Sequence, residues 1–184
     1  MLQKLAMAII KISGWTLVGE APAIRKAVII AAPHTSNWDG FWLLVAKCGL
    51  DFNVRFLAKH SLFWWPLGSI LHAFGAMPID RSVASATVDE LVKMFATEER
   101  LFLALAPEGT RRLRPHWKTG FYQIAKAADV PIVLAFIDYK RKRMGIGITL
   151  PTGQTIDEDL QSIREFYEPC VGRRPDRCSP IRFP

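Results

Sequence analysis

The stretch that decides the fold is Ala27-Val28-Ile29-Ile30-Ala31-Ala32, which ends at Pro33 and is followed by a helical pattern over residues 39–49. A short, β-branched apolar run with a proline at its end is typical of a strand buried on both faces. Apolar runs and helical patterns continue to alternate from this point to residue 166. We therefore expect an α/β domain with a mostly parallel central sheet and helices on both faces.

The other segments follow the same two patterns. Further strands are predicted at residues 54–58, 74–79, 101–106, 132–137 and 144–150. Further helices are predicted at residues 82–100, 118–129 and 156–166. We expect three parts in the chain: an amphipathic helix over 1–20, the main domain over 21–169, and an irregular tail rich in proline and arginine over 170–184.

The composition indicates one folded domain with a basic surface. Half of the 184 residues are hydrophobic and 22% are charged, which excludes a disordered chain. The net charge of +7 favours an anionic partner, which is a nucleic acid, an anionic membrane or a phosphorylated substrate. The mean hydropathy of +0.14 fits a membrane surface better, and no recognition motif for a nucleic acid is visible. Three scattered cysteines, Cys48, Cys170 and Cys178, predict neither a disulfide framework nor a metal site.

The N-terminal helix has two faces of different chemistry. Lys4 and Lys11 lie seven residues apart and share one stripe, and they interrupt the apolar run too early for a spanning helix. Apolar residues at helical spacing form the other face: Leu2, Leu5, Ile9 and Ile12. This pattern predicts a helix in the headgroup region with Trp15 as an anchor. We expect the protein to lie on the cytoplasmic side of a membrane, as a peripheral or monotopic protein. The alternative is a first helix packed on the domain core.

His34 and Asp39 flank the turn that follows the predicted strand at residues 27–32. Open α/β sheets place their sites at the carboxyl ends of strands, where His34 stands. Ser36 as N-cap with Asp39 three residues later resembles a capping box, which turns Asp39 back toward His34. A carboxylate that holds one imidazole nitrogen leaves the other available as a base. The alternative is a structural helix-start acid beside a loop histidine. No Gly-x-Ser-x-Gly elbow is present, so a serine hydrolase is not indicated.

Two arginines follow other predicted strands. Arg81 comes after the strand at 74–79, and Arg111 comes after the strand at 101–106. Two such guanidinium groups can clamp a phosphate. Gly109 permits a close backbone approach, and the turn at Gly109-Thr110 can present amides to an anion. Alternatively, Arg81 pairs with the aspartate before it, and the residues around Gly109 form an ordinary turn.

Four segments together resemble the glycerolipid acyltransferases, the family of 1-acylglycerol-3-phosphate acyltransferase. His34-x-x-x-x-Asp39 resembles the histidine-x4-aspartate signature of that family. Three further blocks follow in the same order: Gly-Ala-Met-Pro-Ile-Asp-Arg at 75–81, Ala-Pro-Glu-Gly-Thr-Arg at 106–111, and Val-Pro-Ile-Val at 130–133. The chain departs from the family at Pro78, where an aromatic residue is usual, and at Leu134, where a second proline is common. The resemblance extends over residues 27–137.

The resemblance implies an acyltransferase domain over 21–169. His34 would be the general base and Asp39 would orient it, so that an acceptor hydroxyl attacks a thioester without an acyl-enzyme. The headgroup of a lysophospholipid acceptor would be held by Arg81, Glu108, Gly109, Thr110 and Arg111. Glu108 would accept a bond from a glycerol hydroxyl or orient an arginine.

The resemblance also sets the expected reactants. The donor would be acyl-CoA or acyl-carrier protein, with no cofactor, no metal and no nucleic acid involved. The expected acceptor is 1-acylglycerol-3-phosphate, which gives phosphatidic acid. The alternatives are another lysolipid, such as a lyso-amino-acid lipid, and a basic protein that binds the membrane surface without catalysis.

Overall fold

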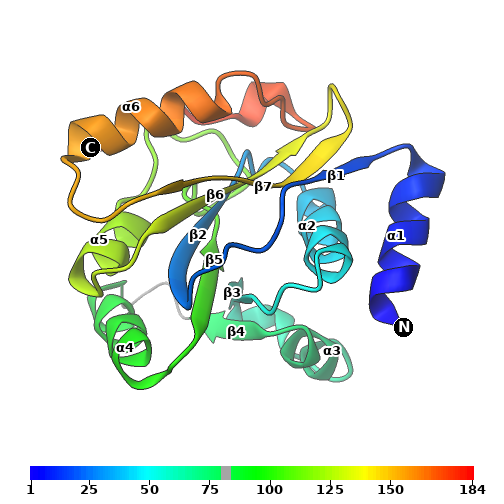
Figure 1. Cartoon of the computed structure of the whole chain (residues 1–184), viewed down its shortest axis with the longest axis horizontal. Helices are drawn as coiled ribbons and strands as arrows, with labels where there is room; N and C mark the ends of the chain where they lie inside the picture. Colours follow the sequence, from blue (N-terminus) through cyan, green and yellow to red (C-terminus); the bar gives the residue numbers. More distant parts are fainter. Residues whose placement is uncertain (80–83) are drawn as a thin grey trace.

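A seven-stranded sheet runs through the protein, with the strand order β1-β7-β6-β2-β5-β3-β4 (Figure 1). The structure is a computed structural model that describes residues 1–79 and 84–184. The strands are β1 (Thr16–Val18), β2 (Lys26–Ala32), β3 (Arg55–Lys59), β4 (Ala76–Ile79), β5 (Leu101–Leu105), β6 (Ile132–Asp138) and β7 (Arg143–Leu150). The α-helices are α1 (Leu2–Ser13), α2 (Asn37–Gly49), α3 (Leu67–Ala73), α4 (Ala84–Thr97), α5 (Gly120–Ala127) and α6 (Ile156–Tyr167).

The strand pairing confirms the predicted α/β class. Five of the six neighbouring pairs are parallel, and only β6 and β7 run antiparallel. Strand β2 lies near the centre, where Ile29 pairs with Ala104 of β5 and with Val133 of β6. All of its residues from Ala27 to Ala32 are buried, which explains why its sequence is continuously apolar.

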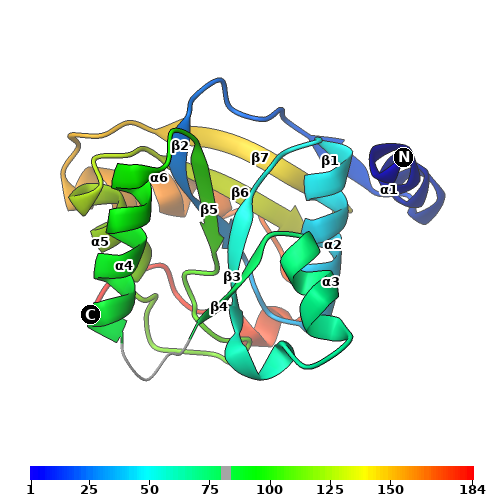
Figure 2. The ribbon, with the colours of Figure 1, turned by 90° about the horizontal axis from the view of Figure 1, so that it is seen from below.

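Helices cover both faces of the sheet. Figure 2 shows α4, α5 and α6 on one side of the strands and α1, α2 and α3 on the other. Side chains alternate along β2, so Val28 and Ile30 join the core that contains Phe121 and Tyr167, whereas Ile29 packs against Phe52 on the opposite face. The sheet therefore has two apolar layers, and its carboxyl edge is left for the loops that follow the strands.

The N-terminal helix is shorter than the predicted span of 1–20. It ends at Ser13, because Gly14 adopts the left-handed conformation with φ of 72°. Residues 16–18 then form β1, which pairs with β7 and which the sequence pattern did not indicate. Trp15 is 8% exposed and its ring lies 4.7 Å from that of Trp42, so the predicted interfacial anchor at Trp15 is wrong.

Helix α1 packs on the domain through a narrow face. Ala6 and Ile10 are buried there, and the Gln3 side chain donates a hydrogen bond to the Gly49 carbonyl at 3.3 Å. Leu2 and Ile12 stay exposed on the outer side. Across the part of the chain that the structure describes, we find no helix with the length and hydrophobicity needed to cross a bilayer.

Candidate active site

The loop between β2 and α2 carries His34 at the carboxyl end of β2. Asp39, in the first turn of α2, is fully buried below this loop. Its Oδ2 accepts hydrogen bonds from the amides of Thr35 at 2.6 Å and Ser36 at 2.7 Å, and its Oδ1 accepts one from the Ser36 hydroxyl at 2.8 Å. The predicted capping box is therefore present, with aspartate at the third helical position.

Asp39 also faces His34, as the spacing predicted. His34 Nδ1 lies 3.7 Å from Asp39 Oδ2, which is close enough for an ion pair and longer than a hydrogen bond. The Ser36 hydroxyl donates to Asp39, which gives it a structural partner within the same turn. The loop thus holds one imidazole beside one buried carboxylate.

Tyr139 is a neighbour of this carboxylate that sequence reasoning missed. Its hydroxyl donates to Asp39 Oδ1 at 2.8 Å, across 100 residues of chain. Burial raises the pKa of the Tyr139 phenol well above its usual value, and the Asp39 carboxylate raises it further, so the phenol stays a neutral donor. The available signal was position, because Tyr139 directly follows β6 at the same edge of the sheet.

Glu108 contacts the backbone of the loop that carries His34. It follows β5, is 3% exposed, and its Oε1 accepts a hydrogen bond from the His34 backbone amide at 2.8 Å. Burial raises the pKa of Glu108 to about 7 and the Asp39 charge adds to the rise, while the hydrogen bond from His34 lowers it. Glu108 is not one of the described residues that line the adjacent cavity, so its predicted contact with a substrate hydroxyl stays a prediction.

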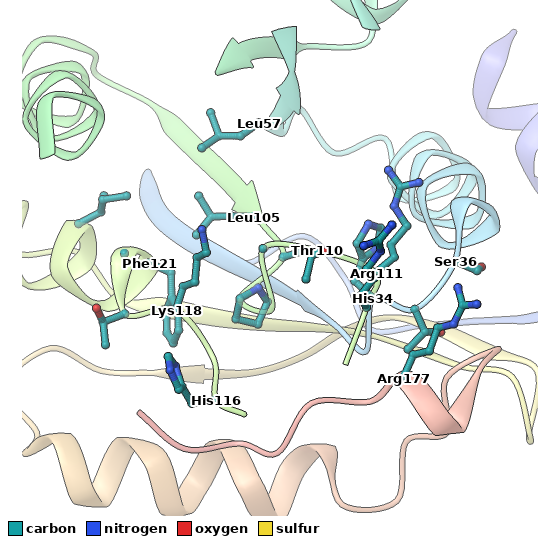
Figure 3. A pocket seen from close by; sticks show the side chains of 18 of the residues that line it. His34, Ser36, Leu57, Leu105, Thr110, Arg111, His116, Lys118, Phe121 and Arg177 are labelled. Carbon is teal, nitrogen blue, oxygen red and sulfur yellow. The ribbon is translucent and has the colours of Figure 1, made fainter. Parts of the chain in front are cut away.

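A cavity of about 1200 Å³ opens beside His34 (Figure 3). Gly109, Thr110 and Arg111 line it, as expected for residues at the end of β5, and Gly109 has the left-handed φ of 64°. Apolar side chains line another part of its wall: Leu57, Leu91, Leu105, Phe121 and Ile124. Arg81, the other predicted headgroup ligand, lies outside the described residues.

The described lining of the cavity is strongly cationic. The positively charged side chains are Arg111, Arg112, Lys118, Arg173, Arg174 and Arg177, whereas Asp89 is the one carboxylate side chain among the described lining residues. In the view of Figure 3, Arg111 and Arg177 lie at the same end of the cavity as His34, and Lys118 and Phe121 lie toward the other end. An anion that also carries an apolar chain fits this lining.

The site therefore places an imidazole beside a cavity that has cationic and apolar walls. The imidazole beside Asp39 can accept a proton from a hydroxyl, the arginines can bind an anionic group, and the apolar wall can contact a hydrocarbon chain. Among residues 1–79 and 84–184, no group of three or more histidine, cysteine or acidic side chains has an arrangement that could hold a metal ion.

Comparison with known proteins agrees with this arrangement. Over 96 residues, the chain is 33% identical to a probable 1-acyl-sn-glycerol-3-phosphate acyltransferase 5 of Arabidopsis thaliana; the match covers 50% of this chain and 26% of that protein. The chain thus spans about a quarter of the length of this curated relative. The crystal structure of the 1-acyl-sn-glycerophosphate (LPA) acyltransferase PlsC from Thermotoga maritima has the same fold, with a TM-score of 0.62 and 17% identity over 91% of this chain and 75% of that one.

A model of the acyltransferase family matches residues 15–137, which is about two thirds of the 184 residues. The matched range contains β2, the His34 loop, Asp39 and the turn with Glu108 and Arg111. The chain therefore belongs to the acyltransferase family.

Proposed function

We propose that this protein transfers a fatty acyl group from a thioester donor, acyl-CoA or acyl-carrier protein, to a hydroxyl of a lysophospholipid. The proposed acceptor is 1-acylglycerol-3-phosphate, and the product is then phosphatidic acid. The observation that carries the proposal is the His34 imidazole next to buried Asp39, beside a cavity with cationic and apolar walls. The two similar proteins described above are both named as acyltransferases of 1-acylglycerol-3-phosphate.

In the proposed reaction, His34 acts as the general base. Because Nδ1 is the nitrogen near Asp39, Nε2 is the one that takes the proton of the acceptor hydroxyl. The hydroxyl oxygen attacks the thioester carbonyl, the C–S bond breaks, and the imidazolium returns its proton to the leaving thiolate. The products are an ester and a free thiol, and no acyl-enzyme forms. Asp39 stabilises the imidazolium, and base assistance of this kind contributes about 10²–10⁴-fold to the rate.

The lining of the cavity offers suitable contacts for the phosphate and for the acyl chain of the acceptor. Arg111 and the turn at Gly109-Thr110 would hold the phosphate, together with Arg81. The apolar wall that includes Leu105 and Phe121 would contact an acyl chain. Glu108 contributes by fixing the backbone of His34, which sets the position of the base.

A panel assay of the full chain tests the proposal. Lysophosphatidate and a lyso-ornithine lipid serve as acceptors, each with palmitoyl-CoA and with palmitoyl-carrier protein. We expect His34→Ala to lower turnover at least about 100-fold with an unchanged circular dichroism spectrum. His60→Ala, at an exposed histidine outside the cavity lining, is the matched control. Turnover by a folded His34→Ala variant within tenfold of the parent would rule out His34 as the base.

We also propose that the protein attaches peripherally to the cytoplasmic face of a membrane. The support is the outer side of α1, where Leu2, Leu5 and Ile12 are exposed, and the loop before α3, where Trp65 is 83% exposed. Figure 2 shows α1 and α3 on the same side of the sheet. Burial of each large aliphatic side chain in lipid is worth about 1.5–3 kcal/mol, so this attachment should resist salt.

Co-sedimentation with phosphatidylglycerol vesicles tests the attachment. We expect the parent to pellet with the vesicles in part even in 1 M salt, and the variant Leu2→Glu/Leu5→Glu/Ile12→Glu to stay in the supernatant. These positions are exposed, so the substitutions leave the packed face of α1 intact. A parent that stays in the supernatant at low salt as well as in 1 M salt contradicts the proposal.

A further inference from the structure

The C-terminal segment 171–179 is hydrogen-bonded to the His34 loop, which connects β2 and α2. The Val171 amide donates to Asp138 Oδ1 at 3.2 Å, and the Val171 carbonyl accepts from the Tyr139 amide at 2.9 Å. The Arg174 amide donates to the Thr35 hydroxyl at 3.2 Å. Thr35 is fully buried and directly follows His34. The segment that sequence reasoning set apart as an irregular tail is therefore bonded to the ends of β6 and of the His34 loop.

Gly172 lets the segment lie this close to the Thr35 side chain. A Cβ atom at this position would lie 2.9 Å from Thr35 Cγ2 and 3.2 Å from Cys178 Sγ, so a larger residue would push the segment away from the loop. The far end of the segment is also held, because the Ser179 hydroxyl accepts a hydrogen bond from the Arg114 amide at 3.0 Å. Hydrogen bonds at Val171, Arg174 and Ser179 thus hold the segment at both ends and near its middle.

Three arginines on this fixed segment line the substrate cavity. Arg173, Arg174 and Arg177 are all exposed at its wall. The Arg173 guanidinium lies 5.3 Å from the centre of the Trp38 ring, and Arg177 Nε lies 3.9 Å from the exposed carboxylate of Asp176. The Arg174 guanidinium forms no ion pair with any residue in the described ranges 1–79 and 84–184. Like charges that line one cavity repel one another, and a bound anion relieves that repulsion.

We infer that Arg173, Arg174 and Arg177 form a binding site for the phosphate ester of a substrate that occupies the cavity next to His34. The inference rests on the proposed function, and it adds ligands from a segment outside residues 15–137, the range that the family model matches. Guanidinium groups on a fixed backbone suit a phosphate, because they donate paired hydrogen bonds to its oxygens. Such an ester is carried by the acceptor headgroup and by the nucleotide end of a CoA donor, and the test separates these two sources.

A direct binding measurement tests this arginine site without requiring any acyl transfer. Isothermal titration calorimetry of the full chain uses two probes. Dodecyl phosphate represents the acceptor headgroup, and adenosine 3′,5′-bisphosphate represents the nucleotide end of the donor. We expect the parent to bind at least one probe with a Kd below about 1 mM and the variant Arg173→Gln/Arg174→Gln/Arg177→Gln to bind that probe at least about tenfold more weakly. Weaker binding of dodecyl phosphate assigns the site to the acceptor, and weaker binding of the bisphosphate assigns it to the donor.

The control removes one positive charge far from the cavity. Arg25 is exposed and precedes β2, at the opposite end of that strand from His34, so Arg25→Gln should bind both probes like the parent. The inference is overturned if the triple variant binds like the parent, or if the parent binds neither probe. Failure of the proposed function gives a different result. In that case the parent is inactive or the His34→Ala variant is fully active, while the triple variant still binds the probe more weakly than the parent.

Discussion

Substitution of Glu108 by glutamine should change the way in which stability depends on pH. Glu108 is buried, its Oε1 accepts from the His34 amide, and its Oε2 has no hydrogen-bond partner among the described residues. Burial raises the pKa of this carboxyl from an ordinary value of 4.5 to about 7. The folded protein therefore holds a proton on Glu108 between pH 4.5 and 7 that the unfolded chain releases.

The sign and size of the effect follow from this difference in pKa. Where the folded state binds more protons, the free energy of unfolding falls as the pH rises. One pKa unit corresponds to about 1.4 kcal/mol, so the shift from 4.5 to about 7 predicts a loss of about 3 kcal/mol, complete above pH 7. Glu108→Gln cannot ionise, yet it keeps an amide oxygen for the His34 amide, so the variant should lack this loss.

Urea unfolding at pH 4.5, 5.5, 6.5 and 7.5 measures the difference. The free energy of unfolding of Glu108→Gln, relative to the parent, should rise by about 3 kcal/mol over this range. Glu99→Gln, at an exposed glutamate, should follow the parent at each pH. If the curves of the parent and of Glu108→Gln run parallel between pH 4.5 and 7.5, then Glu108 does not carry a raised pKa, and burial does not disfavour its ionised form.

Three further predictions concern Tyr139, Gly145 and Gly40. Tyr139→Phe removes the hydrogen bond to Asp39, so it should lower kcat several-fold with unchanged KM values and cost about 1 kcal/mol in urea unfolding; an unchanged kcat in a destabilised variant would show a purely structural role. Gly145→Ala should detach β1 and expose residues 14–25 to limited proteolysis, because its Cβ would lie 1.9 Å from the Val18 carbonyl oxygen at a φ of 147°. Gly40→Ala meets no atom within 4 Å inside α2 and should stabilise the protein by about 0.5–1 kcal/mol; proteolysis of both alanine variants at the rate of the parent would contradict the account of Gly145.

Local patterns explain why the centre of the site could be predicted. The apolar run that forms β2 and the capping box at Ser36 and Asp39 are both properties of a few adjacent residues. Together they place His34 at the carboxyl end of a strand and turn Asp39 toward it. The turn after β5 was located in the same way, although the bond from the His34 amide to Glu108, 74 residues away, leaves no trace in local sequence.

Contacts between distant segments account for what was missed. Tyr139 reaches Asp39, and the arginines after Gly172 reach the cavity, only because the sheet brings the ends of β2 and β6 together. Strand β1 was missed because it has three residues and none of them is buried, so it lacks the apolar run of a central strand. Helix α3 was also not predicted, because its seven residues are too few to show helical periodicity.

The pairing of β1 with β7 also sets an order of events during synthesis. Val18 pairs with Gly145, which is made 127 residues later, and at about 5–20 residues per second this takes about 6–25 s. The apolar cluster that buries Ile10 of α1 also contains Ile137 and Met144. Helix α1 and strand β1 thus wait for β7, which is made much later, before they can complete their packing. Closing so long a loop is slow, and a chain stalled before residue 145 would keep part of the inner face of α1 exposed along with its outer one.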